Sequence, residues 1–237
     1  LVADDPGPIS SQTEQDTRHF SRFSKLPCFD PSSAQEAYEM IQEAFEYSEK
    51  YGTPVFLRPT TRVCHGYASI MVKDETEYTH HQPEGFIKDS KRWVIFPRLS
   101  FMNHKKIEAR NQELSDIFSS YEKNTIHPSC DAFKDSKKGI ATGGISYTYT
   151  METLKKTGMV KTLKIATPHP FPEKLAVDFL SGLDEVLCLE ELDPVIEREL
   201  IYICGKYHLP TRINGKLSGH TACAGENTRD TITTYIN

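Results

Sequence analysis

Short apolar runs alternate with longer amphipathic stretches in two parts of this 237-residue sequence, residues 1–60 and 138–213. Residues 185–189 (EVLCL) form a nearly continuous apolar run, which is typical of a strand buried on both faces of a sheet. The stretch opened by Asp193 and Pro194 then repeats apolar residues at helical spacing. Strands that alternate with helices pair in parallel, because each helix carries the chain back across the sheet. The sequence therefore predicts an α/β fold built on a parallel sheet.

The most regular single helix is expected over residues 33–50. Ser33 and Glu36 have the spacing of a capping box, and Gly52 provides a stop. The helix has one apolar stripe, formed by Ala37, Met40, Ile41, Ala44 and Phe45. Residues 54–57 are expected to return as a buried strand.

The middle of the chain is less regular. Residues 68–72 and 93–96 alternate as short strands do, and residues 100–123 have a helical pattern. We expect this middle part to act as a connector that packs on its neighbours. The tail after Asn214, rich in Gly, Thr and Asn, is expected to be a linker.

Composition excludes several classes of protein. The chain has 28 Lys and Arg against 33 Asp and Glu, a net charge of −5, so it lacks the basic field that binds nucleic acid. No apolar run approaches the roughly 18 residues that a membrane span needs. The six cysteines are scattered without the spacing of a zinc site, so we expect no bound metal and reduced thiols in a cytoplasmic protein. Because the sequence opens with LVADD, without Met or a secretion signal, we expect an internal fragment of a longer protein.

Four loops follow predicted strands, where ligands of α/β proteins collect. In residues 4–18 a helix start and Arg18 could bind a carboxylate or diphosphate, although solvated charges around a capped helix explain them as well. Residues 58–62 (RPTTR) could bind an anion or form an interdomain contact. Residues 142–147 (TGGISY) could offer amides to phosphate or form a tight turn. In residues 190–193 (EELD) the carboxylates could act as acid and base, or cap a helix and be solvated.

Several of these motifs, taken together and in order, are similar to the α subunit of indolepyruvate:ferredoxin oxidoreductase. They are VADDPGP and SSQTEQDTR (2–18), PSSAQEA (31–37), LRPTTRVCH (57–65), GGISY (143–147) and LEELDPV (189–195). The resemblance spans nearly the whole chain and is weakest over residues 73–135.

The resemblance implies a parent enzyme that oxidatively decarboxylates aryl-pyruvates such as indolepyruvate to acyl-coenzyme A. Such enzymes use thiamine diphosphate with magnesium and 4Fe-4S clusters, work with a β subunit and pass electrons to ferredoxin. On the family's map, residues 1–66 correspond to the C-terminal part of a pyrimidine-binding domain, residues 67–135 to a connector and residues 136–237 to a transketolase C-terminal-like, Rossmann-like domain. The activating acid, the magnesium–diphosphate motif and the cluster cysteines are expected outside these residues.

The fragment itself is accordingly expected to be inactive, to bind no cofactor and to contain no catalytic residue. The resemblance makes the loop around residues 10–18 a border of the substrate and cofactor cleft, with Ser11, Gln12, Gln15 and Arg18 as candidates and Arg18 facing the 2-oxo acid carboxylate. For Arg58, Thr60, Thr61 and Arg62 we expect an interdomain or anion-binding role.

Two alternatives stay open: another 2-oxo acid:ferredoxin oxidoreductase, of the pyruvate or 2-oxoglutarate type, or a non-catalytic α/β module that binds a partner or a nucleotide. Because a cut parallel sheet exposes an edge and apolar faces, the chain is also expected to associate with itself.

Overall fold

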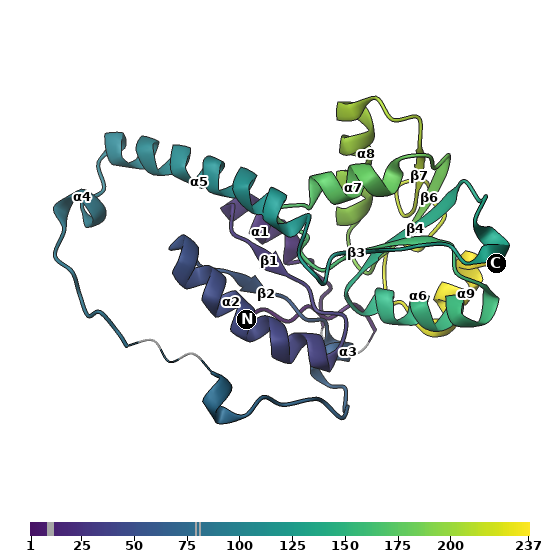
Figure 1. Ribbon diagram of the computed structural model, residues 1–237, viewed down its shortest axis with the longest axis horizontal. Helices are drawn as coiled ribbons and strands as arrows, with labels where there is room; N and C mark the ends of the chain where they lie inside the picture. The colour runs from purple at the N-terminus through teal and green to yellow at the C-terminus, as the bar shows by residue number, and fades with distance from the viewer. Residues whose placement is uncertain (9–11, 79, 81) are drawn as a thin grey trace.

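The computed structural model describes residues 1–8, 12–78, 80 and 82–237. Its main body is a five-stranded sheet in the order β3-β5-β4-β6-β7 (Figure 1). Four of these strands run parallel: β4 (Lys138–Gly143), β5 (Lys161–Ile165), β6 (Glu185–Leu189) and β7 (Arg212–Asn214). The edge strand β3 (Thr125–His127) is antiparallel to β5. The predicted α/β fold with a mainly parallel sheet is confirmed.

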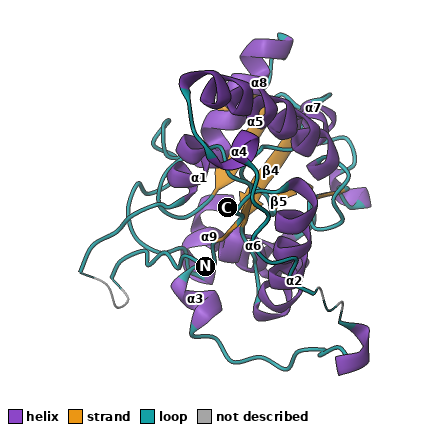
Figure 2. Cartoon of the chain, turned by 90° about the vertical axis from the view of Figure 1, so that its left-hand side faces the viewer, coloured by secondary structure: helices purple, strands orange, loops and turns teal. Residues whose placement is uncertain are grey.

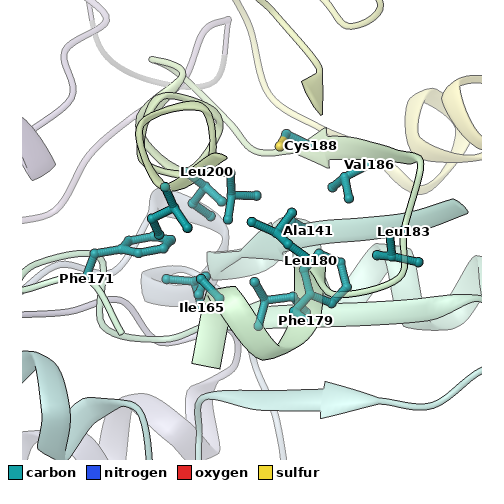
Figure 3. Packing of buried hydrophobic residues seen from close by; sticks show 13 residues of the cluster. Ala141, Ile165, Phe171, Phe179, Leu180, Leu183, Val186, Cys188 and Leu200 are labelled. Carbon is teal, nitrogen blue, oxygen red and sulfur yellow. The ribbon is translucent and has the colours of Figure 1, made fainter. Parts of the chain in front are cut away.

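Helices cover both faces of this sheet, because successive side chains of each strand point to opposite sides. Helices α7 (Glu173–Leu180) and α8 (Val195–Tyr207) pack over one face, whose core includes Ala141, Ile165, Val186 and Leu200 (Figure 3). Helices α6 (Gly144–Thr157) and α9 (Arg229–Ile236) pack over the other face, on Ile140 and Leu189. The layers of helix, sheet and helix are visible end-on in Figure 2.

The tail after Asn214 is not the linker that was expected. Helix α9 packs along α6, and its Ile232 is completely buried. Thr228 caps this helix through the amide of Thr231. An eight-residue helix with one buried apolar side chain has too weak a periodic pattern to be recognised within a polar stretch.

The N-terminal residues form a smaller unit beside the main sheet. Strands β1 (Cys28–Phe29) and β2 (Phe56–Leu57) pair in parallel, and the N-terminal residues run along β2, with Asp4 bridged to Thr60. Helix α1 (Arg18–Ser24) precedes β1, and the short helix α3 (Thr61–Cys64) follows β2.

Helix α2 (Ala34–Tyr51) confirms the predicted helix but buries only part of its predicted stripe. Met40 and Ala44 are buried, whereas Ile41 and Phe45 remain 43% and 69% exposed. Ser33 caps the helix through the amide of Glu36 as expected, but the Glu36 carboxylate accepts hydrogen bonds from Ser32 and from Lys164 of β5 instead of closing the box.

A long helix, α5 (Pro97–Phe118), lies in the chain between an extended segment and β3. Its C-terminal residues Leu114 and Phe118 share a core with Phe29 of β1 and with Ala166, which directly follows β5. The strands expected at residues 68–72 and 93–96 are absent: those residues lie in an extended loop that holds the short helices η1 (Glu75–Glu77) and α4 (Ser90–Trp93). The 3-10 helix η2 (Asp131–Phe133) leads from β3 to β4.

Candidate functional site

The carboxyl ends of β4, β5 and β6 are covered by the N-terminal unit of the same chain. The amide of Asp30 donates to the carbonyl of Ala166 at 2.8 Å, just after β5, and the amide of Cys28 donates to His169 at 2.7 Å. In open α/β sheets this edge is where ligands usually bind. Here it buries a set of charged side chains that we call the ionic cluster: Asp4, Asp16, Arg18, Asp30, Arg58 and Glu190.

Arg18 stands at the start of α1 and is only 3% exposed. Its guanidinium donates to both oxygens of Asp16, to Glu190 Oε2 at 2.8 Å and to the carbonyl oxygens of Glu191 and Asp193, each at 2.8 Å. Burial alone would lower the pKa of Arg18, but the carboxylates of Asp16 and Glu190 raise it well above its usual range. Every nitrogen of the guanidinium therefore has a protein acceptor.

Arg58, which directly follows β2, is the second cation of the ionic cluster. Its Nε donates to Asp4 Oδ2 at 2.5 Å, and its Nη1 donates to Asp30 Oδ1 at 3.2 Å. Asp4 Oδ2 also accepts from the amide and the hydroxyl of Thr17, at 2.9 Å each. Burial would lower the pKa of Arg58, but Asp30 and the other carboxylates raise it. These bonds tie the N-terminal segment, β2 and the start of α1 together.

Glu190 fills the position where a free anion would bind at the N-terminus of α8. Its carboxylate accepts from the amides of Val195 and Ile196, at 3.1 and 3.0 Å, and of Glu197 at 3.0 Å. A helix N-terminus favours negative charge, so Glu190 caps the helix from within the chain. Asp193, the residue expected to cap this helix, instead has its Oδ2 atom 2.8 Å from His19 Nε2.

The glycine turn before α6 is shaped by the N-terminal unit. Gly144 has a φ of +52°, and a Cβ atom on it would lie 3.2 Å from Asp30 Oδ1. The turn of residues 142–147 thus allows a buried carboxylate to approach closely, and a side chain at this position would be strained.

Glu191, which follows β6, is a buried carboxyl group whose pKa lies above its usual value. Burial raises its pKa to about 7, against the lowering effects of the Asn227 amide, which donates to it at 2.9 Å, and of Arg58. Asn227 also donates from its side chain to Ser146 on α6, at 2.9 Å. Glu191 therefore connects the end of β6 to the segment before α9.

The loop of residues 12–18 is exposed over residues 12–15 and buried over residues 16–18. Gln12 and Gln15 are exposed, whereas Asp16, Thr17 and Arg18 are buried; Ser11 lies outside the described residues. Glu14 holds the loop by accepting from the amides of Gly7 at 2.5 Å and Gly225 at 2.9 Å. The structure thus brings Gln12 and Gln15 to the surface directly beside the ionic cluster.

The residues after Arg58 divide in the same way. Thr61 is buried and donates to Asp5 Oδ1 at 2.6 Å, and Thr60 is buried beside Asp4. Arg62 is exposed and makes a two-pronged ion pair with Glu226, at 2.6 and 2.7 Å. This pair joins the N-terminal unit to the segment before α9.

The thiamine diphosphate that the resemblance implies would be held through a divalent cation, which needs oxygen ligands. Among the described residues, no group of three or more His, Cys, Asp or Glu side chains is placed to hold a metal ion. The six cysteines are free and scattered, so the described part of the chain does not fit an iron–sulfur cluster either.

Within the described ranges no helix is long and apolar enough to cross a membrane.

Sequence reasoning missed the role of the carboxylates. Asp4, Asp16 and Asp30 are the partners of the two buried arginines, and Asp30 was not a candidate at all. The one available signal was composition: two arginines predicted near strand ends need buried carboxylates nearby.

The geometry defines a class of protein: a mainly parallel, Rossmann-like α/β domain whose ligand edge is covered by a second α/β unit through buried ion pairs. In structure the chain is similar to a 2-oxoglutarate:ferredoxin oxidoreductase from Magnetococcus marinus, with a TM-score of 0.57 and 14% sequence identity over 89% of this chain and 41% of that one. This likeness concerns the fold.

Sequence comparison finds relatives that match most of the chain. The chain is 38% identical over 221 residues to indolepyruvate oxidoreductase subunit IorA of Methanothermobacter thermautotrophicus, covering 92% of the chain and 35% of that protein. It is 37% identical over 221 residues to IorA of Pyrococcus abyssi, covering 91% and 34%. No protein-family model matches it. Over about nine-tenths of its own length the chain is similar to IorA subunits, and it spans about a third of the length of these curated relatives.

Proposed function

We propose that this chain is part of a thiamine diphosphate-dependent oxidoreductase that converts indolepyruvate and other aryl-pyruvates to acyl-coenzyme A. The observation that carries the proposal is the sequence identity with IorA subunits over nine-tenths of the chain. The complete enzyme would use magnesium and 4Fe-4S clusters, a β subunit and ferredoxin. The free thiols of all six cysteines are in keeping with a reducing, cytoplasmic location.

The two α/β units support a division of the chain into parts. Residues 1–66 would be the C-terminal part of a pyrimidine-binding domain, since they hold a small parallel sheet with α2. Residues 136–237 would be the transketolase C-terminal-like domain. Residues 67–135 would be a connector that also supplies β3, the edge strand of the larger sheet.

Within this enzyme we propose that the ionic cluster positions the loop of residues 12–18. Arg18 reaches a substrate carboxylate only by giving up Asp16, Glu190 or a backbone carbonyl, so its proposed role is to hold the loop. Gln12 and Gln15 on the exposed edge are then the described candidates for contact with substrate or cofactor. The neighbouring Ser11 is included by its place in the sequence.

The test is turnover by the complete subunit with its β partner. Indolepyruvate, phenylpyruvate, pyruvate and 2-oxoglutarate are compared as substrates with ferredoxin as acceptor, and the aryl-pyruvates should have the highest kcat/KM. A preference for pyruvate or 2-oxoglutarate would favour the other oxidoreductase type. No turnover of any of them would contradict the proposal.

Single variants test the loop. Gln12→Ala and Gln15→Ala should each lower kcat/KM about tenfold, the effect of one lost hydrogen bond in a site, without lowering the melting temperature. Lys134→Ala, on an exposed turn far from this edge, is the matched control and should leave both unchanged. Unchanged kinetics in both glutamine variants would remove the loop edge from the site.

Cofactor binding should differ between residues 1–237 and the complete subunit. Calorimetry with thiamine diphosphate and magnesium should show no binding to residues 1–237 and clear binding to the complete subunit, because the described residues offer no cation site. Tight binding to residues 1–237 would contradict the proposed division. A nucleotide-binding module is less well supported, since Glu190 occupies the anion position of α8.

A further inference from the structure

Helix α2 carries an apolar groove on its outer side. Ile41 and Phe45 stand exposed in its centre, between a hollow of about 460 Å³ that reaches Tyr38 and Tyr78 and a second of about 200 Å³ that reaches Leu1 and Leu57. Glu46 and Glu49 line the rim. We call this surface the α2 groove. Exposed apolar patches of this kind, rimmed by polar residues, mark interaction sites.

A second apolar surface lies on the segment of residues 84–106, which we call the arm. Its exposed side chains include Phe86 (78%), Trp93 (47%), Ile95 (63%), Phe96 (64%) and Phe101 (59%). They are partly ordered by one another: Phe86 stacks on Trp93 at 5.6 Å, Arg92 lies 4.6 Å from the Trp93 ring, and the indole donates to Ile87 at 2.7 Å. The arm thus presents a formed aromatic surface.

The charges around the two surfaces are complementary. The arm holds six Lys and Arg against two Asp and Glu, whereas α2 holds five Glu against one Lys. In the described part of the chain, Lys91 and Arg92 on the arm make no ion pair with a carboxylate, and Glu46 and Glu49 on α2 make none with a cation. Opposite charges around apolar centres favour the pairing of these two surfaces.

The arm does not cover the groove of its own molecule. Helix α5 is 22 residues long, about 33 Å, and is anchored at its C-terminal end by Leu114 and Phe118. Figure 1 shows α4 at the outer end of α5, and the hollow that Lys91 and Arg92 line reaches Lys50 and Tyr51 at the end of α2 but not Ile41 or Phe45. The aromatic side chains of the arm and the centre of the α2 groove consequently both remain exposed.

We propose that the arm of one copy docks in the α2 groove of a second copy. A two-fold axis then places the second arm in the first groove, so that both apolar surfaces of each molecule are buried. Phe86, Trp93 and Phe96 would cover Ile41 and Phe45, with Lys91 and Arg92 facing Glu46 and Glu49. This inference concerns assembly and is independent of the proposed function.

The experiment uses the full chain and two charge-reversed variants, Glu46→Lys/Glu49→Lys in the groove and Lys91→Glu/Arg92→Glu on the arm. Light scattering after size exclusion should give twice the monomer mass of 26.9 kDa for the native chain. Each variant alone faces like charge at both contacts, which should raise the dimer Kd about 100-fold. Mixed in equal amounts, the two variants match at both contacts and should form a dimer again. The control Lys134→Glu/Lys137→Glu, at exposed positions outside both surfaces, should remain dimeric.

Restoration on mixing is the decisive result, because a misfolded variant would not regain its partner. A native chain that stays monomeric up to its solubility limit would overturn the proposal. So would variants that remain dimeric alone, or that stay monomeric when mixed.

Discussion

Arg18 and Glu190 are joined by an ion pair of 2.8 Å across 172 residues of sequence, and each is at most 3% exposed. Glu190 at the same time caps α8, and Arg18 opens α1. One contact therefore fixes the N-terminal unit to the carboxyl edge of the main sheet. Because the pair is desolvated, its two members depend on each other.

Removal of the Arg18 guanidinium should therefore lower the stability of the fold. Arg18→Met leaves Asp16 and Glu190 buried without their partner, so the free energy of unfolding should fall by about 3–5 kcal/mol. The double variant Arg18→Met/Glu190→Gln removes one of the stranded charges and should recover about 1–2 kcal/mol. Urea titrations of both variants measure the difference, and a double variant less stable than the single one would contradict this account.

Arg58 and Arg62 form a natural comparison of buried and exposed arginines. Arg58→Ala strands Asp4 and Asp30 in the interior and should cost about 3–5 kcal/mol. Arg62→Ala loses an ion pair whose arginine side chain is 47% exposed, so solvent screening limits the cost to about 0–1 kcal/mol. Thermal unfolding of the two variants checks the order. Equal losses of stability in the two variants would mean that Arg62 stabilises the fold more than its exposure predicts.

The elements of the main sheet could be predicted because their patterns are local. The run at residues 185–189 became β6 with the same bounds, and the helix expected after Asp193 and Pro194 became α8. Residues 93–96 were misjudged because alternation in a short stretch also occurs in exposed chain, where Trp93 and Ile95 form no sheet pairs. The exposure of Ile41 and Phe45 on the α2 stripe could not be predicted either, because periodicity does not show which apolar residues have a packing partner.

The site was predictable only in part. The loop of residues 4–18 and the turn at residues 190–193 were both located, yet nothing in the sequence indicated that they face each other. The pairing of Arg18 with Glu190 depends on how the N-terminal unit docks on the sheet, which is a long-range property. Asp30 entered the site for the same reason, through a backbone bond to Ala166.

The tail after Asn214 should contribute to stability through Ile232. This side chain is fully buried with Ile140, Leu154 and Leu189, so Ile232→Ala should lower the free energy of unfolding by about 2–5 kcal/mol. Ile236→Ala, four residues on and only partly buried, is the matched control and should cost less. Chemical denaturation compares them, and an Ile232→Ala variant as stable as the native chain would mean that α9 does not pack as described.

Glu191 should make stability depend on pH near neutrality. Burial raises the pKa of its carboxyl from 4.5 to about 7 in the folded chain, so between these values the folded state holds a proton that the unfolded state has lost. The folded state is then favoured below about pH 4.5, and this contribution is lost as pH rises to about 7, with a total of about 2–4 kcal/mol. Glu191→Gln keeps an acceptor for the Asn227 amide without a titrating group. Its free energy of unfolding, measured by urea titration from pH 5 to pH 8, should fall less steeply than that of the native chain. Parallel curves for the two proteins would show that Glu191 does not titrate in this range, and that its burial is relieved by a partner outside the contacts described.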